Sequence, residues 1–146
     1  MSVRVLLVFP RFNENSFWSL RAACQVHGAQ CPAPPLGLIT LAALLPQEWT
    51  FRLVDRNVGK LKPADLAWAD LVMTGGMLPQ RVDTLEVIRL CREAGRPVAV
   101  GGPDPTSCEE IYAAADFRVM GEAEGLIDEF VAAWDRGERG ARLRAE

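Results

Sequence analysis

The chain has 146 residues, of which 49% are hydrophobic and 24% are charged, a composition typical of one globular domain and unlike that of a disordered segment. Its net charge of -3 at pH 7 argues against a general nucleic-acid-binding protein. The longest apolar stretches, Val5 to Pro10 and Leu36 to Pro46, are far too short for a membrane span, and the start lacks the apolar region of a signal peptide. We therefore expect a cytoplasmic domain.

Five short apolar runs predict the strands of a parallel sheet. The first, Val3 to Phe9, is an almost unbroken series of valine and leucine ended by Pro10, as in a strand buried on both faces. Four further runs have the same character and are each closed by a polar or glycine-rich segment: Thr50 to Asp55, Leu71 to Thr74, Pro97 to Gly101 and Phe117 to Met120.

The segments between these runs have the apolar spacing of helices. Apolar residues recur at i, i+3, i+4 and i+7 within residues 38–45, 87–94 and 127–134. Thr106 and Glu109 have the spacing of a capping box, which predicts that a helix begins there, directly after the turn Gly102 to Pro105. A shorter helix is expected near Phe17 and Trp18, inside the long irregular region of residues 11–35.

The alternation of strands and helices predicts an α/β fold: a doubly wound, flavodoxin-like or Rossmann-like parallel sheet of five strands in the order 2-1-3-4-5. We expect one domain over residues 1–134. Residues 135–146, DRGERGARLRAE, have the polar, glycine-containing composition of a linker to a further domain.

Three glycine-bearing loops follow strands three, four and five. Because the carboxyl ends of parallel strands meet at one edge of the sheet, we expect these loops to lie together there as a ligand platform. Glycine lets the backbone approach a flat or bulky ligand, although short turns between a strand and a helix also use glycine for tight bends. The loops are Thr74-Gly75-Gly76-Met77, Gly101-Gly102-Pro103-Asp104-Pro105-Thr106 and Gly121-Glu122-Ala123-Glu124-Gly125.

A set of short motifs runs in order along nearly the whole chain: Pro34-Pro35-Leu36-Gly37-Leu38, Leu45-Pro46, Asp55, Gly101-Gly102-Pro103 and Gly121-Glu122-Ala123-Glu124. In order and spacing this set resembles the cobalamin (vitamin B12)-binding domain that precedes the barrel of B12-dependent radical SAM proteins. Two further pieces, Ser16-Phe17-Trp18 and Leu66-Ala67-Trp68-Ala69-Asp70, resemble one branch of that group, which has a further uncharacterised domain after its barrel.

The resemblance implies a corrinoid on the carboxyl edge of the sheet, with a radical SAM barrel of the parent chain covering its upper face. The parent would use methylcobalamin and S-adenosylmethionine to transfer a methyl group to an unactivated carbon. In this chain the loops at 101–103 and 121–123 would flank the nucleotide tail and the ring, and residues 74–77 would underlie the ring. The candidate cofactor-binding residues are Thr74, Gly75, Gly76, Met77, Gly101, Gly102, Pro103, Thr106, Gly121, Glu122 and Ala123.

Two motifs found in related proteins are absent. Many cobalamin domains carry Asp-x-His-x-x-Gly, whose histidine ligates cobalt, but the single histidine here, His27, has Gln25 and Gln30 at the flanking positions. We therefore expect base-off cobalamin without a histidine ligand. The cluster motif Cys-x-x-x-Cys-x-x-Cys is also missing, so the [4Fe-4S] cluster, S-adenosylmethionine and catalysis are expected in another domain of the parent.

Other functions remain open from the residues alone. A flavin- or nucleotide-binding module is disfavoured because neither GxGxxG nor GxxxxGK[ST] follows the first strand, where Phe9-Pro10-Arg11-Phe12 stands. A phosphoacceptor receiver would need acidic residues where Pro10 and Thr74 lie. A cofactor-free docking domain of the same fold is also compatible with the sequence, with the four tryptophans available for its surface, although large aromatic side chains more often pack in a core. A hydrolase would use Glu122, Glu124, Asp104 and Asp55, residues that more commonly cap helices.

Overall fold

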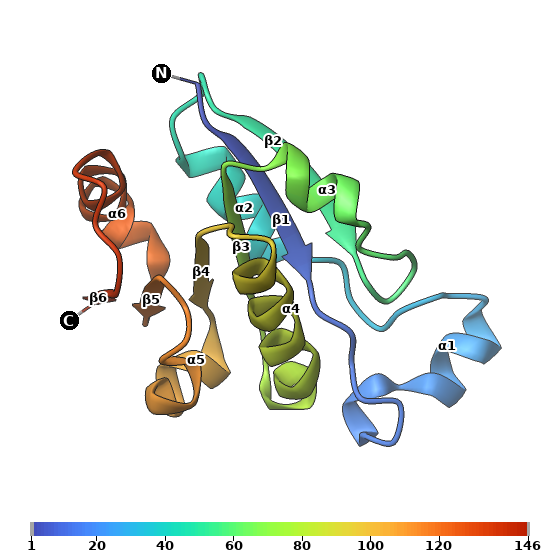
Figure 1. Ribbon diagram of the computed structural model, residues 1–146. Helices are drawn as coiled ribbons and strands as arrows, with labels where there is room; N and C mark the ends of the chain where they lie inside the picture. The colour runs from blue at the N-terminus through green and yellow to red at the C-terminus, as the bar shows by residue number, and fades with distance from the viewer. Residues whose placement is uncertain (1, 146) are drawn as a thin grey trace.

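Residues 2–145, which the computed structural model describes, form a parallel sheet of six strands in the order β2-β1-β3-β4-β5-β6 (Figure 1). The five expected strands and their order are confirmed, and a sixth strand extends the sheet beyond β5. The strands are β1 Arg4–Phe9, β2 Thr50–Asp55, β3 Leu71–Gly75, β4 Val98–Gly101, β5 Phe117–Met120 and β6 Ala141–Arg144.

Helices cover both faces of the sheet, as the doubly wound arrangement requires. On one face α2 (Leu36–Leu44) and α6 (Ile127–Asp135) pack on the strands. On the other face lie α3 (Pro63–Trp68), α4 (Arg81–Glu93) and α5 (Pro103–Ser107) (Figure 1). Short 3-10 helices complete the connections: η1 Phe17–Ser19, η2 Leu78–Gln80, η3 Glu109–Tyr112 and η4 Ala123–Leu126.

The strand β1 supplies side chains to both layers of the core. Val5 and Leu7 face the layer under α2 and α6, whereas Leu6 and Val8 face the layer under α3 and α4, because successive side chains of a strand point to opposite faces. All four are nearly or fully excluded from solvent. This burial on both faces explains the continuous apolar sequence of the strand.

Strand β6 lies within the segment that the sequence analysis assigned to a linker. Leu143 is 4% exposed and packs in the layer under α6, while Arg142 and Arg144 project from the opposite face toward Glu109. The alternation of arginine with apolar residues is the pattern of an edge strand with one buried face. Four residues of alternation inside a charged segment were too short a signal to distinguish from a linker.

The helix after β4 begins earlier than the sequence predicted. α5 starts at Pro103, a favoured residue type for the first helical position, and ends at Ser107. The expected capping box does not form, because the Thr106 hydroxyl donates to the carbonyl of Gly102 (2.8 Å) and Glu109 pairs instead with Arg142. The prediction of a helix beginning at Thr106 is therefore wrong.

The long segment of residues 11–35 contains η1 and a short helix α1 (Arg21–His27), close to the expected position. Neither has a buried residue, and α1 lies beyond the carboxyl end of β1, away from the sheet (Figure 1). The end of the segment returns to the sheet, where α2 begins. Across the described residues, every helix falls short of the length and apolar character that crossing a membrane requires.

Candidate functional site

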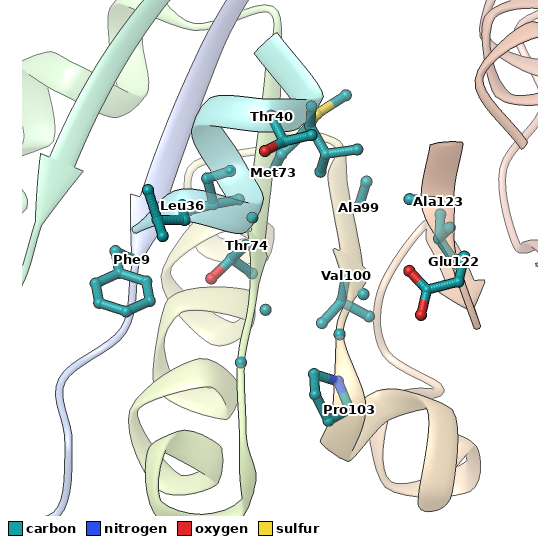
Figure 2. Close-up of a pocket in the computed structure, with 18 of the residues that line it drawn as sticks. Phe9, Leu36, Thr40, Met73, Thr74, Ala99, Val100, Pro103, Glu122 and Ala123 are labelled. Atoms are coloured by element: carbon teal, nitrogen blue, oxygen red, sulfur yellow. The ribbon is translucent and has the colours of Figure 1, made fainter. Parts of the chain in front are cut away.

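A cavity of about 400 Å³ lies at the carboxyl edge of the sheet, between the first turns of α2 and the ends of β1, β3, β4 and β5. Its walls are mostly apolar. Figure 2 shows Phe9 on one side and Glu122 and Ala123 on the other, with Thr74, Val100 and Pro103 between them. An open, mainly apolar hollow at this edge of a doubly wound sheet is where such folds hold their ligands.

The structure brings the three glycine-bearing loops together at this cavity. Of the candidate cofactor-binding residues, only Thr106 does not line it; its hydroxyl lies between two of the loops. The cavity-lining candidates are Thr74, Gly75, Gly76, Met77, Gly101, Gly102, Pro103, Gly121, Glu122 and Ala123.

Two of these glycines are required by contact between the loops. A Cβ atom on Gly75, which has φ 155°, would lie 1.9 Å from the carbonyl oxygen of Gly101. A Cβ atom on Gly102, which has φ 104°, would lie 3.1 Å from the backbone nitrogen of Gly76. The backbones of the loops after β3 and β4 therefore touch, and glycine permits both this approach and the positive φ angles. Tight packing alone accounts for these two residues.

Gly37 has a different environment. It lies in the first turn of α2 and lines the cavity, and a Cβ atom placed on it would meet no atom within 4 Å. Glycine inside a helix is less favourable than alanine by about 0.5–1 kcal/mol, so packing gives no reason for this residue. Its absent side chain leaves the wall of the cavity open.

A further wall of the cavity, formed by α2, the end of β1 and the loop that follows it, was not predicted from the sequence. Phe9, Phe12, Leu36, Gly37 and Thr40 all line the cavity. The motif Pro34-Pro35-Leu36-Gly37-Leu38 supplies part of this wall, but its sequence does not indicate that this end of a long loop returns to the edge of the sheet. The length of the irregular region was the available signal.

The Gln80 side chain fixes the loop after β1 next to the loop after β3. Its Nε2 donates to the carbonyl of Pro10 (2.8 Å), and its Oε1 accepts the backbone N–H of Met77 (3.1 Å). The Asn57 side chain supports the same loop from the turn after β2, since its Nδ2 donates to the carbonyl of Pro10 (3.1 Å) and its Oδ1 accepts from the backbone N–H of Phe12 (3.0 Å). The edge of the cavity is thus held by amide side chains from two neighbouring elements.

The acidic residues near the edge have different surroundings. Asp104 is 5% exposed and accepts hydrogen bonds from Arg81, which holds the pKa of this carboxyl group below its usual range. Asp55 accepts from the backbone and side-chain N–H groups of Asn57, both at 2.8 Å. Glu122 lines the cavity (Figure 2). Two of the four acids of the hydrolase alternative are therefore engaged in structural contacts.

The described residues contain no group of three or more histidine, cysteine, aspartate or glutamate side chains suited to a metal ion. His27 ends α1 and does not contribute to the cavity wall. The chemistry that the edge offers is thus binding: mostly apolar walls with the two carboxylates of Glu122 and Glu124.

The fold and the site together define a doubly wound α/β domain with a ligand-sized cavity at its carboxyl edge. No family model matches the sequence. Two curated proteins resemble it: the uncharacterized methyltransferase sll1242 of Synechocystis sp., 44% identical over 99% of this chain, and the hopanoid C-2 methylase of Rhodopseudomonas palustris, 34% identical over 90% of this chain. The matched regions make up 27% and 25% of those proteins, so the chain spans about a quarter of their length.

Proposed function

We propose that this chain is the cobalamin-binding module of a B12-dependent radical SAM enzyme of the methyltransferase type, and that it holds the cofactor base-off without a histidine ligand. The observation that carries the proposal is the cavity at the carboxyl edge, where the loops after β3, β4 and β5 meet the glycine-bearing first turn of α2. This is the edge to which the sequence resemblance assigns a corrinoid.

The residues present fit part of such a cofactor. The open space beside Gly37 and the apolar walls formed by Phe9, Met73 and Leu41 suit an uncharged aromatic group, as in the nucleotide tail of cobalamin. Thr74 to Met77 would underlie the corrin ring, and the loops at 101–103 and 121–123 would flank the ring and the tail.

The absence of a histidine from the cavity wall supports the proposal that the protein supplies no histidine ligand to cobalt. With His27 in α1, the ring nitrogen that replaces the base in many cobalamin domains has no counterpart among the lining residues. When bound, cobalamin supplies a cobalt–carbon bond through which a methyl group can be transferred. The part of this chain is to bind and orient the cofactor and to exclude water from the side that rests on the loops.

The names of the two relatives support methyl transfer as the reaction of the parent protein. One is called a methyltransferase and the other a methylase, and each is about four times as long as the region that matches. In the proposed parent, a radical SAM barrel would cover the upper face of the cofactor and would hold S-adenosylmethionine and the [4Fe-4S] cluster. The substrate contacts would belong mainly to that barrel.

A visible absorption titration tests the proposal. The purified chain is mixed with increasing hydroxocobalamin, and parallel samples receive flavin mononucleotide. Saturable binding with the spectrum of the base-off form, without comparable flavin binding, would support the proposed function. Flavin binding alone would favour the nucleotide-type alternative. If neither ligand binds to this chain or to its full-length parent, the proposal is wrong and a cofactor-free docking domain becomes the better explanation.

A further inference from the structure

A partly buried ion pair joins two of the loops that line the cavity. Arg81 is the first residue of α4, directly after the loop that follows β3, and Asp104 lies in the first turn of α5, directly after the loop that follows β4. Two guanidinium nitrogens of Arg81, Nε and Nη2, donate to the two oxygens of Asp104 at 2.8 and 2.7 Å. This paired geometry is the strongest and most directional form of an arginine–carboxylate contact.

Two further hydrogen bonds hold Asp104. The hydroxyl of the buried Tyr112 donates to Oδ2 of Asp104, and the backbone N–H of Asp104 donates to the carbonyl of Gly76 (3.1 Å). Its side chain is 4% exposed, whereas that of Arg81 is 28% exposed. A carboxylate excluded from water is stable only when its hydrogen-bonding capacity is met, so Asp104 depends on these partners and fixes their positions in turn.

The contact lies directly behind the wall of the cavity. Neither Arg81 nor Asp104 lines the cavity, but Gly76, Gly102 and Pro103 do. Because the loops touch at Gly75 and Gly102 with no space for a Cβ atom, a small movement of α5 relative to α4 would shift the backbone of Gly76 and Gly102, which lines the cavity. The network is therefore placed to determine the geometry of the platform without touching what rests on it.

We propose that Asp104 is a positioning residue: through Arg81, Tyr112 and Gly76 it holds the loop after β4 against the loop after β3 and so presets the ligand platform. The inference rests on the proposed function for the identity of the ligand. The fixing of the loops is a property of the free domain and can be measured without cofactor. Groups that orient a binding residue from behind typically change affinity by about 10–100-fold when removed, as known for metal ligands.

The test uses Asp104→Asn, which keeps the shape of the side chain and removes its charge. Asp70→Asn is the matched control, because Asp70 also pairs with an arginine through two contacts, at Arg4 on the opposite edge of the sheet. For each variant, amide hydrogen exchange is recorded by NMR without cofactor, and hydroxocobalamin affinity is measured by absorption. Arg81→Lys is a second variant, which keeps the charge and loses the paired geometry.

We expect Asp104→Asn and Arg81→Lys to speed exchange at the backbone N–H of residue 104 and to weaken cobalamin binding about 10–100-fold, while Asp70→Asn changes neither. If Asp104→Asn does not fold, Arg81→Lys carries the same test. Unchanged exchange in the loop variants would overturn the inference, and so would an equal loss of affinity in Asp70→Asn. If the wild type binds no cobalamin but the loop amides still exchange faster in the variants, the proposed function fails and the fixing of the loops stands.

Discussion

The hydroxyl of Thr106 accepts a hydrogen bond from the backbone N–H of Gly121 at 2.9 Å. The same hydroxyl donates to the carbonyl of Gly102 (2.8 Å), so one side chain links the loop after β4 to the loop after β5. Thr106 was predicted to bind the cofactor, but it lies behind the cavity wall and is placed to hold two parts of that wall together.

Removing this hydroxyl should destabilise the domain. We expect Thr106→Val to lower the free energy of unfolding by about 1 kcal/mol, because the link between the two loops is lost and the groups involved are partly exposed to water. Urea denaturation of the two proteins measures the difference. Ser107→Ala is the control, since the Ser107 hydroxyl donates to Pro103 within α5 and reaches no second loop. Equal stability of Thr106→Val and the wild type would contradict the role of the link.

The two kinds of glycine at the cavity should respond oppositely to alanine. In Gly75→Ala the new methyl group meets the carbonyl oxygen of Gly101 at 1.9 Å, so we expect a loss of several kcal/mol or failure to fold. In Gly37→Ala the methyl group enters open space in a helix, so we expect a gain of about 0.5–1 kcal/mol. Thermal or urea unfolding of both variants provides the comparison. If Gly37→Ala were less stable than wild type, the space beside Gly37 could not be open as described.

At low pH, Glu109 should no longer stabilise the folded state. Hydrogen bonds from Arg142, together with the nearby Arg118 and Arg144, lower the pKa of this carboxyl group from 4.5 to about 2. A carboxyl group with a lowered pKa in the folded state stabilises that state above its unfolded pKa, and the effect is lost as the pH falls through the folded pKa. The stability difference between wild type and Glu109→Gln should thus be full at pH 7 and should shrink from about pH 4.5 to about pH 2.

Urea denaturation of Glu109→Gln at several pH values checks this window. Glu110→Gln serves as the control, because Glu110 is an exposed neighbour in the same 3-10 helix. A difference between Glu109→Gln and wild type that stays constant down to pH 2 would show that the arginine cluster does not hold the carboxylate in the charged form.

Electron paramagnetic resonance of bound cob(II)alamin tests whether nitrogen ligates the cobalt. His27 ends α1 outside the cavity wall, so we expect a spectrum without nitrogen superhyperfine splitting and no change in His27→Ala. Splitting that is present in the wild type and disappears in His27→Ala would identify a histidine ligand. Splitting that persists in the variant would show that the cofactor keeps its own base. Either result would contradict the base-off proposal without a histidine ligand.

The parallel sheet was predictable because its strands are buried on both faces. Continuous apolar runs such as residues 3–9 have few alternative structures, and the glycine-bearing loops follow directly from where those runs end. The helix α3 was not predicted from the sequence, because it has six residues and buries only Leu66, so it shows no periodic apolar pattern. Strand β6 was missed because half of its residues are arginines on the exposed face.

One side of the cavity, formed by the glycine-bearing loops, was predictable, whereas the wall formed by α2 was not. The loops after β3, β4 and β5 share an edge as a consequence of strand order, which the sequence indicates. The wall formed by Leu36, Gly37 and Thr40 depends on where a 25-residue irregular segment returns to the sheet. That return depends on tertiary packing, with Leu38 of α2 buried in the core under the sheet, and the spacing within the segment carries no signature of it.

Whether cobalamin occupies this cavity can be decided by comparing its binding to Gly37→Leu and Ala43→Leu. Both substitutions place a leucine side chain on α2, but Gly37 opens onto the cavity and Ala43 is exposed on the same helix outside its wall. We expect Gly37→Leu to fold as well as wild type and to lose saturable binding of hydroxocobalamin, while Ala43→Leu binds like wild type. Undiminished binding by a folded Gly37→Leu protein would show that the cofactor does not occupy this cavity.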